Sequence, residues 1–312
     1  MDYSRPSFLF NKHLETIYPA AFRTVQLADC KQIRITTPDN DFLDLDWYDS
    51  KSEKLVILSH GLEGNSKRAY VLGMANAFIG NGCDVLAWNY RGCSSEMNST
   101  LRFYHSGATD DLDTIVQFAL NHKAYNEINL IGFSLGGNIT LKFLGEEYQT
   151  SKIISKAVAI SVPLDLSTSC AKISSPPNWI YEQRFLRSLK EKVQKKNKNI
   201  PIPNVNLVFG INNLKAFDDI ITGPLHGFTD AEDYYRQCSS IYFLHKIKSP
   251  SLIINALNDP FLSKECFPEK SINKNISFDY QKHGGHVGFS LFNEKKLYWS
   301  ELRALEFIQE GK

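Results

Sequence analysis

Residues 128–138 read INLIGFSLGGN, and this stretch decides the fold. Residues 128–133 are mostly apolar, which is typical of a strand that is covered on both faces of a sheet. A helix is predicted directly afterwards, because apolar residues recur at helical spacing from Leu135 to Leu144. A glycine on either side of Ser134 lets the backbone turn sharply between the two elements, which would leave the serine hydroxyl exposed at the turn.

Strand and helix patterns alternate along the chain on both sides of this stretch. The patterns predict strands at 32–37, 42–48, 55–59, 83–88, 128–133, 157–162, 251–256 and 276–280, and helices at 68–79, 110–120 and 293–309. The first two strands are expected to pair antiparallel through a turn at 38–40. Repeated strand–helix units imply an α/β fold with a mostly parallel central sheet and helices on both of its faces.

The alternation stops after Pro163 and resumes only at the strand predicted for 251–256. The intervening segment is polar in places and has helical patterns at 181–192 and 234–238. The simplest interpretation is that residues 1–312 form a single domain, with an inserted helical cap at about 163–248. The lysine-rich residues 190–198 are expected to form a solvated helix face or loop.

The composition argues against several classes of protein. Lys and Arg number 35 and Asp and Glu 34, so a net charge of +1 gives no general attraction to nucleic acid. No apolar run reaches the ~18 to 20 residues of a membrane span, and the first ten residues lack a signal-peptide pattern. We therefore expect a soluble, cytoplasmic protein, although an apolar cap could contact a lipid surface. The sequence gives no indication of an oligomeric state.

Metal ions and cofactors have little support in the sequence. The six cysteines are scattered without metal-ligand spacing, and in a chain of this size without a secretory signal we expect them to be reduced. Neither a phosphate-binding loop nor a G-x-G-x-x-G motif after a strand is present. We therefore predict no cofactor and no metal.

Two further side chains could activate Ser134, whose hydroxyl is not appreciably ionised at neutral pH. In a sheet of this kind the acid and the histidine follow the serine in that order, on loops after later strands. Asp259 follows the strand predicted at 251–256, and His286 follows the strand predicted at 276–280. Both lie at carboxyl ends of strands, where α/β sheets gather their sites. We predict Ser134 as nucleophile, His286 as base and Asp259 as the acid that orients it.

Other assignments stay open for each position. His283 is an alternative base, but the glycines that surround His286 would let its backbone approach the serine more closely. Four aspartates of the inserted segment are alternative acids, although no strand precedes them: Asp218, Asp219, Asp230 and Asp233. Taken singly, Ser134 could also be a helix cap, Asp259 a surface residue and His286 an ordinary loop histidine.

The negative charge that develops on the reacting oxygen requires hydrogen-bond donors. Residues 60–64 (HGLEG) follow the predicted strand at 55–59, where a backbone N–H can face the reaction centre. We predict an oxyanion hole formed by the N–H groups of Leu62 and Leu135. His60 is expected to be structural, with its ring hydrogen-bonded to the backbone.

Several motifs together resemble one family. They are HGLEG (60–64), NYRGCSSEMN (89–98), YHSGATDDL (104–112), GFSLGGN (132–138), PLHGFTDAEDYY (224–235), INALNDPF (254–261) and GGHVGF (284–289). Over nearly the whole chain they resemble the YheT-like α/β-hydrolases, an abhydrolase-domain group of esterases and lipases. Residues 13–17 (HLETI) resemble that family's HLQTI element, with Glu15 in place of glutamine.

The resemblance implies the α/β-hydrolase fold, a carboxylesterase-like activity and the triad Ser134, Asp259 and His286. The family often has two aspartates before the proline of its acid motif, whereas here the first is Asn258. Asp259 is therefore the only carboxylate at this motif, which favours its assignment.

Together these observations predict a serine esterase that cleaves short- or medium-chain acyl esters through an acyl-enzyme on Ser134. One alternative is an acyltransferase, in which an alcohol rather than water accepts the acyl group from the same serine. Another is a catalytically inactive binding or scaffold protein. Four aromatic residues of the cap could line an acyl pocket or could simply form core: Phe217, Phe228, Tyr234 and Tyr235.

Overall fold

The computed structural model describes residues 2–27, 30–146, 148–269 and 272–310. Within these residues the centre of the molecule is one eight-stranded sheet in the order β1-β2-β4-β3-β5-β6-β7-β8. The strands are β1 (Lys31–Thr36), β2 (Phe42–Tyr48), β3 (Lys54–Ser59), β4 (Asp84–Asn89), β5 (Glu127–Phe133), β6 (Ile154–Ile160), β7 (Ser251–Ala256) and β8 (Ile276–Gln281). Strand β2 pairs antiparallel with β1 and β4, and the other neighbours are parallel. The predicted α/β fold is confirmed.

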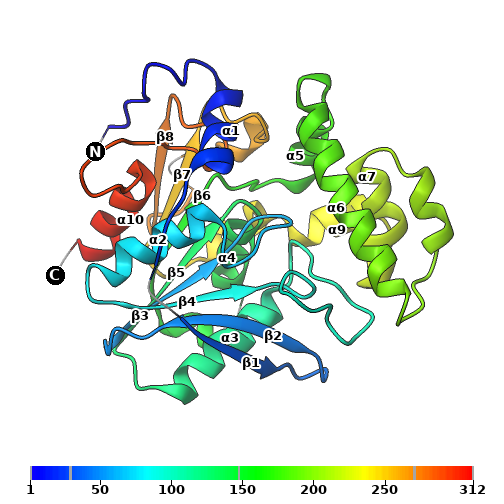
Figure 1. The fold of residues 1–312 in the computed structure, drawn as a ribbon, viewed down its shortest axis with the longest axis horizontal. Helices are drawn as coiled ribbons and strands as arrows, with labels where there is room; N and C mark the ends of the chain where they lie inside the picture. The colour runs from blue at the N-terminus through cyan, green and yellow to red at the C-terminus, as the bar shows by residue number, and fades with distance from the viewer. Residues whose placement is uncertain (1, 28–29, 147, 270–271, 311–312) are drawn as a thin grey trace.

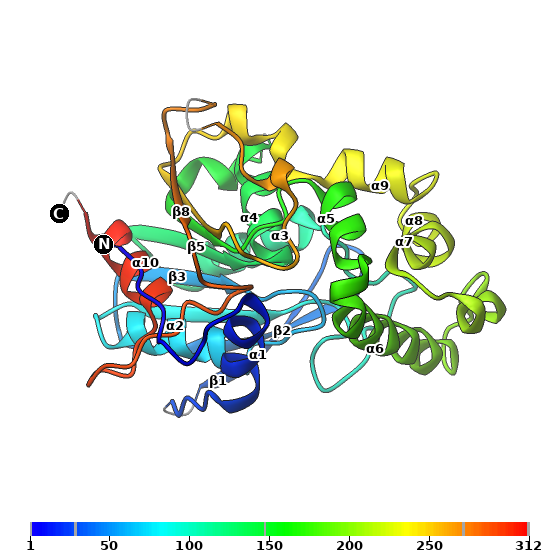
Figure 2. The ribbon, with the colours of Figure 1, turned by 90° about the horizontal axis from the view of Figure 1, so that it is seen from above.

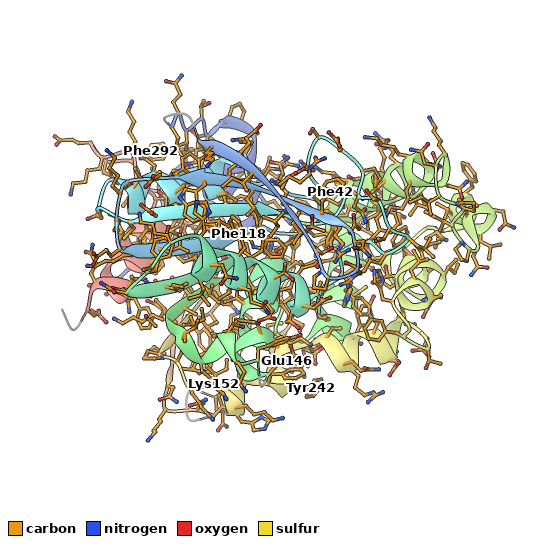
Figure 3. The ribbon with its side chains drawn as sticks, turned by 90° about the horizontal axis from the view of Figure 1, so that it is seen from below. Phe42, Phe118, Glu146, Lys152, Tyr242 and Phe292 are labelled. Atoms are coloured by element: carbon orange, nitrogen blue, oxygen red, sulfur yellow. The ribbon has the colours of Figure 1, made fainter. Side chains whose placement is uncertain are left out.

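Helices cover both faces of the sheet because alternate strand residues point to opposite sides. The covering helices are α2 (Ala69–Ile79), α3 (Thr109–His122), α4 (Leu135–Gly145) and α10 (Trp299–Gln309). In β3, Leu55 and Ile57 belong to the core that α3 and α4 cover. Val56 and Leu58 belong to the core under α2 and α10. Figure 3 shows the α3 side from below; Phe118, labelled there, packs against Trp47 of β2.

The last helix begins later than the sequence pattern predicts. The pattern runs from 293 to 309, but α10 starts at Trp299. Lys296 has a φ of 54°, a left-handed conformation that an α-helix does not contain. The N–H of Tyr298 then donates to the Glu301 carboxylate at 2.8 Å, which caps the first turn. Apolar spacing alone does not reveal this local turn.

Between β6 and β7 the chain leaves the sheet and forms a group of helices, which projects to one side in Figure 1. They are α5 (Leu166–Ile173), α6 (Trp179–Asn197), α7 (Leu214–Phe217), α8 (Gly223–Leu225) and α9 (Ala231–Cys238), with a π-helical turn η4 (Asp218–Thr222) and short 3-10 turns η2 (Pro176–Asn178), η3 (Val205–Gly210), η5 (Ser240–Tyr242) and η6 (Leu244–Lys246). Leu186, Val193 and Val208 are buried in a core that this group largely builds itself. Two further 3-10 turns lie outside the group, η1 (Thr150–Ile153) and η7 (Lys264–Cys266).

The lysine-rich stretch 190–198 is not a fully solvated face, so this prediction was partly wrong. Helix α6 turns Lys192 and Lys196 inward, and Lys196 is completely buried. The Lys196 ammonium donates to the carbonyl oxygens of Thr100 and Arg102 at 2.7 and 2.8 Å. The two lysines therefore fasten α6 to the body of the molecule.

The N-terminal segment crosses the loops that follow β7 and β8. It contains helix α1 (Lys12–Phe22), which lies beside these loops in Figures 1 and 2. Upstream of α1, the Tyr3 hydroxyl donates to the Ser290 carbonyl at 3.2 Å, and the Tyr3 N–H donates to the Gln281 side chain at 3.1 Å. Among the described residues, no helix is long and apolar enough to span a membrane.

Candidate active site

Ser134 lies in a sharp turn between β5 and α4. Its φ of 52° and ψ of −120° are unusual for a residue with a side chain, and its N–H donates to the Ile160 carbonyl at 2.8 Å. Helix α4 approaches the end of β3 so closely that a Cβ at Gly136 would lie 2.4 Å from the carbonyl oxygen of Ser59. A glycine is therefore required at 136, and the packing that requires it fixes the serine turn.

The structure brings together the three residues that sequence order singled out. The Nε2 atom of His286 is 2.9 Å from the Ser134 Oγ, and its Nδ1 is 2.8 Å from Asp259 Oδ2. The Asp259 carboxylate is acceptor-only when ionised, so Nδ1 carries the ring proton and Nε2 is free to accept from the serine hydroxyl. The Phe261 N–H donates to the other Asp259 oxygen at 2.8 Å, and the Phe261 ring packs 4.4 Å from the imidazole.

The loop that carries His286 has an unusual backbone. Four of its residues have positive φ: Gly284 (142°), Gly285 (57°), Val287 (56°) and Phe289 (39°). For a β-branched residue such as Val287 this conformation costs about 1–3 kcal/mol, so the surroundings must hold it. The Val287 N–H donates to the Ser161 hydroxyl at 2.8 Å, which is one such restraint.

The residues considered as alternative bases and acids contact residues other than Ser134. His283 faces the Glu15 carboxylate, with its Nδ1 3.9 Å from the nearer oxygen. The four alternative aspartates are all in the inserted segment. Asp218 accepts a hydrogen bond from the Tyr235 hydroxyl at 2.6 Å, and Asp230 caps α9. The structure therefore gives these residues local structural contacts rather than a place beside Ser134.

The loop after β3 lies directly against the serine. A Cβ at Gly61 would be 3.3 Å from the Ser134 Cβ, so Leu62 follows immediately after the point of contact. Leu135 is the first residue of α4, and its N–H therefore has no acceptor within the helix. Both predicted oxyanion donors thus belong to segments that border Ser134.

Glu63 anchors this loop to the inserted helices. Its carboxylate accepts hydrogen bonds from Lys192 at 2.6 Å, Tyr104 at 2.6 Å and Ser188 at 2.5 Å. Burial opposes ionisation of Glu63, but the Lys192 ammonium and these hydrogen bonds outweigh it and hold the pKa of Glu63 below its usual value. Because Lys192 and Ser188 lie on α6, the anchor joins the loop to the insertion.

His60 is structural, as predicted. Its Nδ1 lies 2.8 Å from the Gly61 carbonyl and its Nε2 accepts from the Tyr90 N–H at 3.3 Å. Complete burial lowers the pKa of His60 to about 3, so the ring is neutral at physiological pH. Both ring nitrogens of His60 therefore form hydrogen bonds with backbone groups.

Ser134 and His286 border a cavity of about 480 Å³, a size typical of a small-molecule site. Its walls come mainly from α1, the loop after β3, the start of α2, and α6. The lining includes Thr16, Ile17, Pro19, Ala20, Leu62, Tyr70, Tyr181, Phe185, Phe261 and Val287. Most of the lining is apolar, which suits an acyl chain better than a charged ligand.

The four aromatic residues considered for an acyl pocket do not line this cavity. Phe217 is 4% exposed and belongs to the core of the insertion. Tyr234 and Tyr235 are buried against α5 and the body, where the Tyr234 hydroxyl accepts from the Ser106 N–H at 2.8 Å. Phe228 packs on the same cluster. Phe217, Tyr234 and Tyr235 are buried because α7 and α9 pack against α5, and Phe228 is partly buried beside them.

Sequence reasoning missed the contribution of α1. Thr16 and Ile17 line the cavity, yet their HLETI motif had no assigned role. The motif itself was the only available signal. Within the described residues no group of three or more His, Cys, Asp or Glu side chains could hold a metal ion, and none of the six cysteines forms a disulfide bond.

Comparison with known proteins agrees with the fold. The sheet and the strand–turn–helix at Ser134 are those of the α/β-hydrolase class, and a family model described as "alpha/beta hydrolase fold" matches residues 54–218. The "Putative esterase YheT" of Escherichia coli (strain K12) is 33% identical and aligns over 89% of this chain and 84% of its own. The chain belongs to the α/β-hydrolase family, in the YheT-like abhydrolase group.

More distant relatives share the same fold. A "Monoacylglycerol lipase" of Saccharomyces cerevisiae is 28% identical over 85% of this chain, which spans 60% of the yeast protein. Among solved structures, the Pyrococcus furiosus esterase Pf2001 superposes with a TM-score of 0.61 at 21% identity, covering 92% of this chain and 97% of its own. This last likeness is one of fold.

Proposed function

We propose that this chain is a serine hydrolase that cleaves carboxylic esters through an acyl-enzyme on Ser134. One observation carries the proposal: Ser134, His286 and Asp259 form a continuous hydrogen-bonded chain at the wall of an apolar cavity. The names of the relatives, an esterase and a lipase, support the same reaction class. The fold alone would not support a particular reaction, since one fold hosts many activities.

In the first half of the reaction His286 removes the proton from the Ser134 hydroxyl as its oxygen attacks the acyl carbon. Asp259 holds the ring in the tautomer that leaves Nε2 free, and stabilises the imidazolium that forms. The tetrahedral intermediate collapses when its C–O bond to the alcohol breaks. The imidazolium returns the proton to that oxygen, so an alcohol leaves and the acyl-enzyme remains.

In the second half a water molecule repeats the attack on the acyl-enzyme. His286 takes a proton from the water, the bond to the Ser134 oxygen breaks, and the serine regains its proton. The N–H groups of Leu62 and Leu135 stabilise the oxyanion in both halves. Removing one such donor typically costs about 3–4 kcal/mol of transition-state stabilisation.

We further propose that residues 1–312 are one domain in which the insertion at about 163–248 caps the site. Helix α6 supports this role, because its Tyr181, Phe185 and Ser188 line the cavity opposite α1. The apolar walls favour esters with a short or medium acyl chain. A small-molecule ester is therefore the expected partner.

The decisive test replaces the nucleophile. The Ser134→Ala variant should fold as the wild type does and lose essentially all turnover of p-nitrophenyl esters, because it removes the hydroxyl that the His286 imidazole contacts. Ser249→Ala is a suitable control, since Ser249 donates to the Ile154 carbonyl at the start of β6, away from the site. Undiminished turnover by folded Ser134→Ala protein would contradict the proposal.

Two simple measurements separate the alternatives. Product analysis with and without an added alcohol shows whether the acyl group passes to water or to the alcohol. A fluorophosphonate probe should label wild-type protein at Ser134 and leave Ser134→Ala unlabelled. Folded wild-type protein that fails to react with the probe would favour a scaffold role.

A further inference from the structure

We propose that Glu15 and Thr16 of α1 are positioning residues for the reaction: they hold the loops of Asp259 and His286 at a fixed separation. This proposal rests on the function proposed above. Both residues belong to the N-terminal segment, which lies beside these two loops in Figure 2. Neither is required to touch the reacting atoms.

Glu15 connects the two loops through one carboxylate oxygen. Its Oε2 accepts from the Gly284 N–H at 2.6 Å, two residues before His286. The same oxygen accepts from the Asn258 side-chain amide at 3.0 Å, one residue before Asp259. Its position therefore fixes how far the acid loop lies from the histidine loop.

Asn258 completes this connection. While its Nδ2 donates to Glu15, its Oδ1 accepts from the Gly285 N–H at 3.1 Å. The acid loop, the histidine loop and α1 are thus joined in a closed set of hydrogen bonds. Displacing any member changes the separation of the other two.

Thr16 acts on the base itself. Its hydroxyl oxygen accepts from the backbone N–H of His286 at 2.9 Å and donates to the Lys12 carbonyl at 2.7 Å. The hydroxyl is therefore held by its own helix, and it restrains the backbone from which the imidazole projects. A shift of His286 by a fraction of an ångström would lengthen its 2.9 Å contact with Ser134.

Packing brings α1 and the histidine loop into direct contact. A Cβ at Gly285 would lie 2.7 Å from the Thr16 hydroxyl oxygen and 2.9 Å from the Glu15 Cβ. No larger residue fits between them without movement. Because the loop has several positive φ angles, it needs such support to keep its conformation.

The Glu15 carboxylate is buried, and a buried carboxylate is seldom found where a residue serves packing alone. The residue is 1% exposed, and its charge is balanced by the Arg5 guanidinium at 2.9 Å from Oε1. Placing an ionised carboxylate there is costly unless its hydrogen bonds are all made. The hydrogen bonds that Oε2 makes go to the two loops that the reaction requires.

The experiment compares Glu15→Ala and Thr16→Val with a matched control. Each variant should lower kcat on a p-nitrophenyl ester, by roughly 10- to 100-fold for Glu15→Ala, because misplacement of this size costs about that much. KM should stay near the wild-type value for Glu15→Ala, since Glu15 does not line the cavity. Fluorophosphonate labelling should slow in parallel with kcat.

Asp84 provides the control. It is equally buried and accepts from the Ser50 and Ser52 N–H groups, Lys123 and Tyr125, but it lies at the start of β4, whereas the acid and histidine loops follow the carboxyl ends of β7 and β8. Asp84→Ala should lower the melting temperature and leave kcat of the folded protein unchanged. A loss of kcat in Asp84→Ala as large as that in Glu15→Ala would overturn the proposal, since stability alone would then explain both.

A conservative variant sharpens the result. Glu15→Gln keeps one carbonyl oxygen that can accept from both Gly284 and Asn258, so it should recover most of the kcat lost in Glu15→Ala. Full kcat in both Glu15→Ala and Thr16→Val, alongside an inactive Ser134→Ala, would refute the positioning role and leave the proposed function intact. Activity of Ser134→Ala would instead refute the proposed function.

Discussion

Ser134 adopts a backbone conformation that neighbouring segments hold in place. Its φ is 52°, its N–H is bonded to the Ile160 carbonyl, and α4 is pressed against the end of β3 at Gly136. The hydroxyl therefore points at the His286 imidazole without needing to be ordered at the moment of reaction. Such preorganisation lowers the entropic part of the barrier.

Removing the negative charge of Asp259 should affect the reaction more than the fold. In Asp259→Asn the side-chain amide would donate to His286 Nδ1, which moves the ring proton to Nε2 and prevents it from accepting from Ser134. We expect kcat to fall by roughly 10⁴-fold, as for the same change in a serine protease triad. Steady-state hydrolysis of a p-nitrophenyl ester by the wild type and by Asp259→Asn measures this decrease in kcat.

Asp279→Asn is the control for this change, because Asp279 of β8 binds Arg303 at 2.9 Å and lies outside the cavity lining. Its kcat should match that of the wild type. If folded Asp259→Asn protein kept a tenth of the wild-type kcat, Asp259 would not be the orienting acid.

The sequence predicted these three residues because each follows its own strand, a relation that can be read locally. It gave no role to Glu15, whose partner Gly284 is 269 residues away. In the sequence, Glu15 cannot be distinguished from any other glutamate of a helix, because its role depends on two loops that only the fold brings next to it. The cap aromatics were equally undecided, because core and cavity positions share the same apolar character.

At the scale of elements, the loop after β3 and helix α6 are held together by one buried ion pair. Glu63 and Lys192 are 8% and 11% exposed and lie 2.6 Å apart. The Lys192 ammonium also contacts the Cys93 sulfur at 3.1 Å. The position of the predicted oxyanion donor Leu62 therefore depends on the insertion.

Breaking this pair should destabilise the protein. Lys192→Met leaves the Glu63 carboxylate buried with neutral partners, and we expect the free energy of unfolding at pH 7 to fall by roughly 3–5 kcal/mol. The double variant Glu63→Gln/Lys192→Met removes the unpaired charge and should recover much of that loss. Urea denaturation of the four proteins in the cycle measures both effects.

The same pair predicts how stability depends on pH. Because the pKa of Glu63 lies below its usual value in the folded protein, its contribution is present above about pH 4.5 and is lost as the pH falls through the folded pKa. Lys192→Met should therefore reduce the free energy of unfolding most at pH 7, and progressively less as the pH falls and Glu63 becomes protonated. A penalty that is constant between pH 7 and pH 4 would contradict this assignment.

The elements of the sheet were predictable because buried parallel strands give continuous apolar runs bounded by turns. Helix α10 was placed six residues too early, since the turn at Lys296 has no apolar signature. The inward lysines of α6 were also missed. The carbonyl partners of Lys196, at Thr100 and Arg102, come from a loop that sequence periodicity does not describe.

On the scale of the whole molecule, the cavity is assembled from helices that are far apart in the chain. Helix α1 lies on one side and α6 on the other, and His13 and Tyr181 join them with a 3.1 Å contact between the ring Nδ1 and the hydroxyl. These two residues are 168 positions apart. The shape of the cavity therefore depends on how the insertion packs against the N-terminal segment.

From this arrangement we predict that Phe185 of α6 influences which acyl-chain lengths the cavity accepts. Its side chain lines the cavity and packs on Phe261, with ring centroids 6.0 Å apart. Phe185→Trp should shorten the space for the acyl chain, so kcat/KM should fall for longer esters more than for acetate. Each methylene excluded from an apolar site costs ~0.8 kcal/mol, which is roughly fourfold in kcat/KM.

A series of p-nitrophenyl esters of graded chain length tests this prediction. Phe185→Ala should move the preference in the opposite direction, toward longer chains, because it enlarges the same space. Phe209→Trp adds an indole at a position that is 74% exposed in η3, and should leave the chain-length profile unchanged. If all three variants kept the wild-type profile, the acyl chain would have to bind outside the space between α1 and α6.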